Sequence, residues 1–103
     1  MSTLVVVAPL KDGALERARE LLDEGPPFKL EASRFEEHEV FLTPREVVFV
    51  FKGGSGSGPG GTLALAAEDP QVWRAAKAWG ECLDGRPRIA RSVFAWKRES
   101  PAG

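Results

Sequence analysis

The sequence predicts an α+β fold with the element order β-α-β-β-α-β, a four-stranded antiparallel sheet and two helices on one face. Short β-branched runs, two intervening apolar patterns with helical spacing, and turn signals at the junctions predict this order. The chain has 103 residues, which fits one domain. We expect that domain to span residues 1–98 and a flexible tail to occupy residues 99–103.

The first strand and the first helix come from the N-terminal quarter of the chain. Leu4–Leu10 is a β-branched apolar run that stops at a Pro and an Asp-Gly turn, which predicts a strand. Asp12 is placed to cap a helix, and Gly25 followed by two prolines is placed to end it. Apolar residues recur between them at helical spacing, at Ala14, Leu15, Ala18, Leu21 and Leu22.

Two further strands and a glycine-rich loop follow. Phe35–Leu42 and Arg45–Lys52 are separated only by Thr43-Pro44, which predicts an antiparallel hairpin. The second run is strongly β-forming. Gly53–Gly61 then has six glycines in nine residues, which is typical of a flexible loop.

The last helix and strand complete the order. Thr62–Ala67 predicts one or two helical turns, and Asp69 with Pro70 restarts the helix as N-cap and first residue. The pattern ends at Gly85, and Ile89–Trp96 predicts the last strand. The apolar stripe of this helix consists of Val72, Ala76, Trp79 and Leu83.

Both central strands are apolar on both faces. Leu4–Ala8 and Val47–Phe51 do not alternate, although one face of such a sheet normally meets water. If 400 Å² of apolar surface stayed in contact with water, the protein would lose roughly 10 kcal/mol of hydrophobic stabilisation, at ~25 cal/mol/Å². We therefore expect a homodimer in which two sheets pack face to face. The uncovered set is either Val47, Phe49 and Phe51 or Val48 and Val50.

The hairpin His38–Phe51, HEVFLTPREVVFVF, and the doubly apolar sheet carry a resemblance to a known family. The chain resembles the dimeric α/β-barrel superfamily, in which two ferredoxin-like subunits pack their sheets into a shared barrel. It is similar to small uncharacterised bacterial members and, distantly, to antibiotic-biosynthesis-monooxygenase-like proteins. The resemblance implies a pocket between helices and sheet. It does not select one activity.

His38 is the candidate catalytic residue, because imidazole is the side chain whose unperturbed pKa lies near neutrality. It shares a strand face with Val40 and Leu42, so a half-buried ring could act as a general base on a phenol or enol. The alternative is that His38 caps a strand edge or bonds a neighbouring Glu. Glu37 and Glu39 point the opposite way on the strand.

Four residues are candidate ligand contacts. Trp79 lies inside the apolar stripe of the helix, whereas Trp73 lies beside it. There Trp73 would either line a pocket or pack against its neighbours without contacting a ligand. Phe49 would form another wall. Arg91 alternates with apolar neighbours and would hold an anionic ligand or pair with a Glu.

Two other features resemble functional motifs, a glycine-rich segment and a single cysteine. Gly56–Gly61 matches a G-x-G-x-x-G pattern, but Pro59 removes one amide and the chain is too short for a doubly wound sheet. We interpret it as a loop or pocket lid. Cys82 has no sequence signature that pairs it with His38, so we expect a small half-buried residue rather than a nucleophile.

Composition limits the function classes. Acidic residues number 15 and basic residues 14, which argues against a nucleic-acid binder. One Cys and one His cannot form a multi-ligand Cys/His metal site, and we expect no cofactor. No apolar run has the length of a membrane span, and no secretory signal pattern opens the chain, so we expect a cytoplasmic protein.

Three functions remain open at this point. The first is a cofactor-free enzyme (a monooxygenase, isomerase or cyclase) acting on a small hydrophobic aromatic or enolic compound. The second is a protein that binds or senses such a compound without turnover. The third is a structural dimer without a site.

Overall fold

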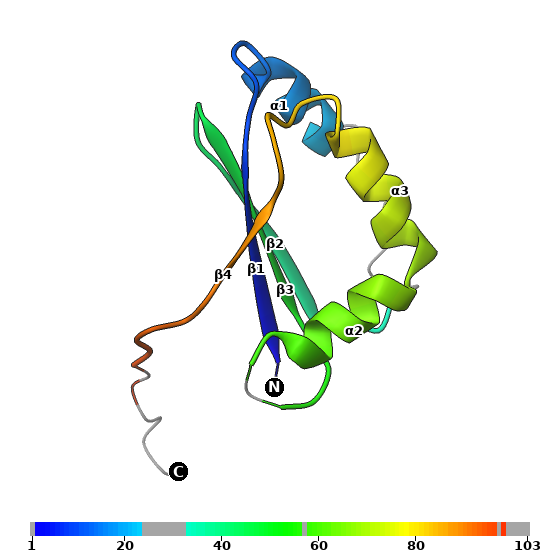
Figure 1. Ribbon diagram of the computed structural model, residues 1–103, viewed down its shortest axis with the longest axis vertical. Coiled ribbons are helices and arrows are strands. Elements are labelled where there is room, and N and C mark those ends of the chain that lie inside the picture. Colours follow the sequence, from blue (N-terminus) through cyan, green and yellow to red (C-terminus); the bar gives the residue numbers. More distant parts are fainter. Residues whose placement is uncertain (1, 24–32, 57, 97, 99–103) are drawn as a thin grey trace.

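The computed structural model describes residues 2–23, 33–56, 58–96 and 98. Within them the chain forms β1 (Thr3–Pro9), α1 (Leu15–Asp23), β2 (Glu37–Leu42), β3 (Glu46–Lys52), α2 (Gly60–Glu68), α3 (Pro70–Trp79) and β4 (Arg88–Ala90). The strands form one sheet in the order β2-β3-β1-β4, and every neighbouring pair is antiparallel. Figure 1 shows the helices along one side of this sheet. The predicted ferredoxin-like arrangement is confirmed.

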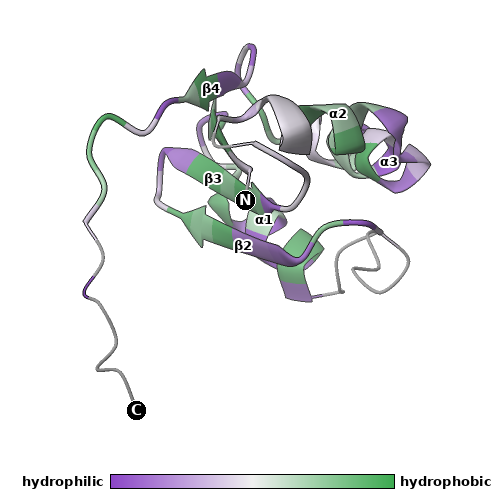
Figure 2. Cartoon of the chain, turned by 90° about the horizontal axis from the view of Figure 1, so that it is seen from below, coloured by the Kyte–Doolittle hydropathy of each residue, from purple (hydrophilic) through white to green (hydrophobic). Residues whose placement is uncertain are grey.

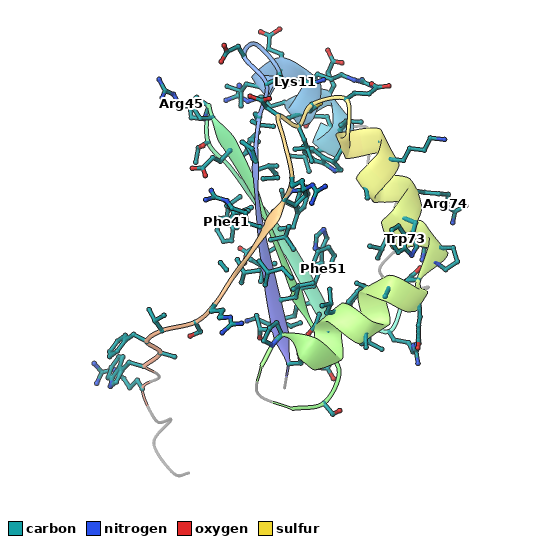
Figure 3. All side chains as sticks on the ribbon, viewed as in Figure 1. Lys11, Phe41, Arg45, Phe51, Trp73 and Arg74 are labelled. Atoms are coloured by element: carbon teal, nitrogen blue, oxygen red, sulfur yellow. The ribbon has the colours of Figure 1, made fainter. Side chains whose placement is uncertain are left out.

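Strand register decides which side chains face the helices. Val47 is completely buried, whereas its neighbour Val48 is only half-buried. Because side chains alternate along a strand, Val47, Phe49 and Phe51 point to the inner face, towards the helices. Val48 lies opposite Val7 and Val50 opposite Val5, so these four valines form an apolar outer face. Figure 3 shows Phe51 on the helix side of the sheet and Phe41 on the other.

The start of α3 follows the prediction, and its end does not. The Asp69 carboxylate accepts a hydrogen bond of 2.9 Å from the Gln71 amide, and Pro70 is the first helical residue. We predicted that the helix would continue past Leu83, but it ends at Trp79. Beyond it, the Cys82 carbonyl accepts from the Lys11 amide at 2.8 Å and Leu83 bridges Leu10. Pairing with the end of β1 takes these residues out of the helix.

The last strand is shorter than predicted. We expected Ile89–Trp96, whereas β4 spans only Arg88–Ala90, opposite Val7, Val6 and Val5. The prediction was wrong because a β-forming sequence needs a partner strand. Beyond Val5, β1 has only Leu4 and Thr3 left.

The hydrophobic core lies between the sheet and α1 and α3. Its buried members are Ala8, Leu10, Ala18, Leu21, Val47, Trp79 and Cys82. The presence of Ala18 and Leu21 confirms the predicted apolar side of the first helix. The predicted helix end at Gly25 and the predicted tail at 99–103 lie outside the described residues. Among the described residues, no helix has the length and apolar character needed to cross a bilayer.

The glycine-rich segment is tied to the start of β1. Ser2 is completely buried, and its hydroxyl donates to the Gly58 carbonyl at 2.6 Å and accepts from the Thr62 amide at 2.9 Å. The Thr62 hydroxyl lies 2.7 Å from Ser2 Oγ and 2.8 Å from the Gly53 carbonyl. At Gly61, an added Cβ would lie 2.2 Å from the Ser55 carbonyl oxygen, so the chain passes itself here at a distance that only glycine allows.

Candidate functional site

A cavity of about 500 Å³ lies between the inner face of the sheet and the helices. The sheet side consists of Leu4, Val6, His38, Val40, Phe49 and Phe51. The helix side includes Leu63, Ala66, Val72, Ala75, Ala76 and Trp79. Its size lies within the range of small-molecule sites, and its lining is predominantly apolar.

Small residues at three positions of the helical side help to leave this space open. Ala75, Ala76 and Gly80 line the cavity from α3 and its end, beside the larger Val72 and Trp79. Leucines at these positions would reach towards Phe49 and Phe51 and would fill the space. The helical periodicity predicts that these positions face inward, whereas only packing shows that they leave a cavity.

His38 is the only titratable side chain among the described residues that line the cavity. Its imidazole stacks on the Phe51 ring, with centroids 4.3 Å apart and an interplanar angle of 19°. Its Nδ1 lies 3.0 Å from the Val50 carbonyl oxygen. A carbonyl can only accept a hydrogen bond, so Nδ1 carries the proton and, in the neutral ring, Nε2 carries the lone pair.

The environment of His38 favours the neutral ring. Desolvation by burial lowers the pKa of His38 below its ordinary value, and the hydrogen bond to the Val50 carbonyl only partly opposes this. The imidazole is therefore unprotonated at neutral pH. A neutral imidazole in an apolar cavity can accept a proton from a bound molecule.

Trp79 and Phe49, two of the predicted ligand contacts, both line the cavity. Their rings meet edge to face, with centroids 5.1 Å apart, and Trp79 is 6% exposed. No hydrogen bond of the Trp79 indole N–H occurs within the described part of the chain. None of the described side-chain nitrogens is both sealed from solvent and unbonded, so this N–H keeps some contact with solvent. Trp79 thus brings an indole N–H without a protein acceptor, among the described residues, to the lining of the cavity.

The structure places the other two predicted contacts elsewhere. Trp73 is 64% exposed and does not line the cavity, and its indole N–H donates to the Ala67 carbonyl at 2.9 Å. It lies one residue after Val72, so it points about 100° away from the cavity side of α3. Arg91 follows β4 on an exposed segment and is not part of the lining. It is outside the cavity because β4 ends before it.

Cys82 and the glycine-rich pattern both have structural roles. Burial raises the pKa of the Cys82 thiol, and this residue is 1% exposed in the core. The thiol is therefore protonated at neutral pH and poorly suited to nucleophilic attack. At the start of α2, the Thr62 amide bonds the Ser2 hydroxyl, which occupies the position where the G-x-G-x-x-G interpretation would place a phosphate.

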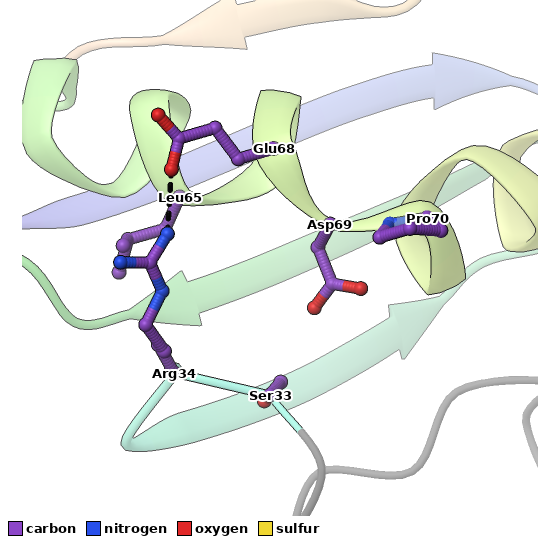
Figure 4. A pocket seen from close by; sticks show the side chains of 6 residues that line it. All are labelled: Ser33, Arg34, Leu65, Glu68, Asp69 and Pro70. Carbon is purple, nitrogen blue, oxygen red and sulfur yellow. Dashed lines mark hydrogen bonds and ion pairs between the residues drawn. The ribbon is translucent and has the colours of Figure 1, made fainter.

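A second, polar hollow of about 200 Å³ lies beside the junction of α2 and α3 (Figure 4). Arg34 and Glu68 form an ion pair of 2.5 Å across it, and the Asp69 carboxylate serves as the cap of α3. Its charged groups are thus engaged with the chain itself. We assign no site there.

Comparison with known proteins identifies the fold and no family. No family model matches the chain, and no curated protein is significantly similar to it. An L-rhamnose mutarotase from Formosa agariphila has a solved structure with a TM-score of 0.63 and 14% identity, covering 94% of this chain and 98% of the mutarotase. An uncharacterised NIPSNAP domain protein from Burkholderia xenovorans has a TM-score of 0.58 and 16% identity, covering 95% and 98%.

These structures share the architecture over nearly the full length of each chain. At such low identity the likeness shows the fold alone. The chain is therefore a ferredoxin-like α+β protein, and its fold does not select an activity.

Proposed function

We propose that this chain binds a small, mainly apolar molecule with an enol, phenol or enolisable ketone in the cavity, and that His38 transfers a proton on it. The cavity itself carries this proposal, because its lining is predominantly apolar and includes one imidazole whose pKa is lowered by burial. Many hydroxyl groups on a ligand would remain unpaired against such walls. The proposed ligand is accordingly an apolar ring system rather than a sugar.

Proton transfer requires a base and a group that stabilises the resulting enolate. Nε2 of His38 takes the proton from the carbon next to the carbonyl, the electron pair of that C–H bond forms the C=C bond of an enolate, and the π pair of the carbonyl moves onto its oxygen. The indole N–H of Trp79 then donates to this oxygen. Return of the proton from the imidazolium to another carbon, or to the oxygen, completes an isomerisation. An oxygenase or cyclase would begin with the same deprotonation.

Proton exchange in D₂O tests the proposal directly. We expect the wild type to exchange the α-protons of 2-tetralone for deuterium, and His38→Gln to lower the protein-catalysed rate at least 10-fold. Glu39→Gln is the matched control on the same strand, since it points to the opposite face and should leave the rate unchanged. Equal rates for wild type and His38→Gln would overturn the catalytic role.

A non-catalytic binding protein is the second candidate. It is favoured by the same lining, in which, among the described residues, Trp79 supplies the one side-chain hydrogen-bond donor besides the histidine ring. The chain has a single His, so its ring signals in NMR report on the cavity without ambiguity. A shift of those signals with 2-naphthol, together with absent exchange of 2-tetralone, would establish binding only. No shift and no exchange would reject both candidates.

We further propose that the protein is a homodimer in which the outer faces of two sheets meet. Val5, Val7, Val48 and Val50 form a contiguous apolar surface there, with Phe41 49% exposed beside them. Monomeric proteins rarely expose such patches, and a second copy of the same patch is its simplest complement. Sedimentation equilibrium at micromolar concentration tests this assembly. A monomer of 11.2 kDa at all concentrations would reject it.

A further inference from the structure

The segment after β4 is the largest exposed apolar feature of the described chain. Val93 is 96% exposed, Phe94 84% and Trp96 68%. The Arg98 guanidinium lies 5.1 Å from the centroid of the Trp96 ring. Scattered surface apolar residues are normal, but three large ones within four positions need an explanation.

The position of this segment relates it to the outer face of the sheet. In Figure 2 it leaves β4 and runs on the side of the sheet opposite α2 and α3. It projects away from its own domain, as Figure 1 also shows. Its aromatic side chains are therefore available on the same side as the outer valines, without covering them.

Charge distribution indicates where on the outer face such a segment would fit. The outward residues of β2 are Glu37, Glu39 and Phe41, all exposed. Glu37 pairs with Lys52 at 3.3 Å, whereas no ion pair of Glu39 occurs among the described residues. The segment begins at Arg91 and is followed by Arg98. Acids and an aromatic on β2 thus complement bases and aromatics on the segment.

We infer that residues 91–96 of one copy pack across the outer side of β2 of a second copy. Phe94 and Trp96 then lie against Phe41 and Val48 of that copy, and Arg91 approaches its Glu39. Twofold symmetry makes the contact reciprocal. This inference depends on the proposed homodimer. We call the contact of Phe94, Trp96 and Arg91 with β2 of the second copy the clasp.

The aromatic side chains would contribute a substantial share of the surface that a stable dimer interface buries. Buried aromatic side chains remove about 150–250 Å² each from water, so two copies of Phe94 and Trp96 contribute roughly 600–1,000 Å². A standard stable interface buries about 1,200–2,000 Å² in total. The aromatic side chains alone fall short of that size, so the central valines have to supply the rest of the interface.

A pair of matched serine variants tests the clasp by sedimentation equilibrium. Phe94→Ser/Trp96→Ser should raise the dimer Kd at least about 100-fold. Trp73→Ser is the control, because Trp73 has nearly the same exposure, 64%, but lies on α3. Circular dichroism confirms that each variant is folded. An unchanged Kd in a folded double variant would overturn the clasp while leaving the dimer intact.

A charge exchange tests the position of the clasp. Glu39→Arg and Arg91→Glu should each weaken the dimer, and the variant with both changes should regain most of the loss. Additive weakening would overturn the contact between the segment and β2. A wild type that stays monomeric would reject the dimer itself. The two proposals therefore fail in distinguishable ways.

Discussion

The central strands β1 and β3 are apolar on both faces, but the two faces have very different surroundings. On β3, Val47 is completely buried beneath the helices, and Val48, the next residue, is half-buried on the outer face. The inner face also holds a cavity with His38 in it, whereas the outer face of the same strand pair carries glutamates and Phe41. Burial here follows from what covers each face rather than from the residues on it.

This difference separates the two proposed roles of a small domain. The covered face is predominantly apolar, and burial there lowers the pKa of His38, which suits the proposed binding and proton transfer. The uncovered face has a flat row of valines bordered by charges, which suits association. Each proposal can therefore be tested by a change that leaves the other face untouched.

Aspartate substitutions at Val47 and Val48 should show the largest difference in unfolding free energy. Val47→Asp buries a carboxylate without a partner and should cost on the order of 4 kcal/mol or more of unfolding free energy. Val48→Asp should change the stability of the monomer by no more than about 1 kcal/mol, since this carboxylate can reach water. Urea unfolding at submicromolar concentration measures both. Similar losses for the two variants would contradict the assignment of faces.

Filling the cavity should lower ligand affinity while changing the unfolding free energy less than Val47→Asp does. Ala75→Leu places a larger side chain in the space beneath α3, so affinity for 2-naphthol should fall at least about 10-fold, while the unfolding free energy changes by less than about 1.5 kcal/mol. Ala64→Leu is the matched control, because Ala64 is exposed on α2 and does not line the cavity. Isothermal titration calorimetry gives the affinities. Retained affinity in Ala75→Leu would show that the ligand binds elsewhere.

Acid should destabilise the fold slightly through His38. Its pKa in the folded protein lies below the unfolded value of 6.5, so the unfolded chain binds more protons between the two values. Stability should therefore be highest above about pH 6.5 and should fall as the pH drops below it, levelling off under the folded pKa. His38→Gln should remove this component of the urea midpoint between pH 7.5 and 5. An equal pH dependence in the variant would show that the ring is not desolvated.

The elements with local signals were predictable. The β-branched runs gave β1 and the hairpin, and Asp69 with Pro70 marked the start of α3, because a cap and a first-turn proline act within a few residues. The ends of α3 and β4 were not predictable in this way. Both depend on β1, which pairs with Leu83 through Leu10 and offers no further partner beyond Thr3.

The candidate site was predictable only in part. Alternation placed His38 on the same side as Val40 and Leu42, and helical spacing placed Trp79 inward. Trp73 and Arg91 lie outside the cavity, since their position depends on the angle of α3 and on where β4 ends. The alanines that help to leave the cavity open had no signal, because a small inward residue is compatible with either a void or close packing.

The sequence alone determined the order of elements, the antiparallel hairpin and the apolar character of both sheet faces, since these follow from periodicity and short-range turn chemistry. The tertiary structure decided which face the helices cover, where a cavity remains and that Phe94 and Trp96 leave the sheet. Register, helix placement and strand pairing depend on contacts between residues far apart in the chain, which no local pattern records.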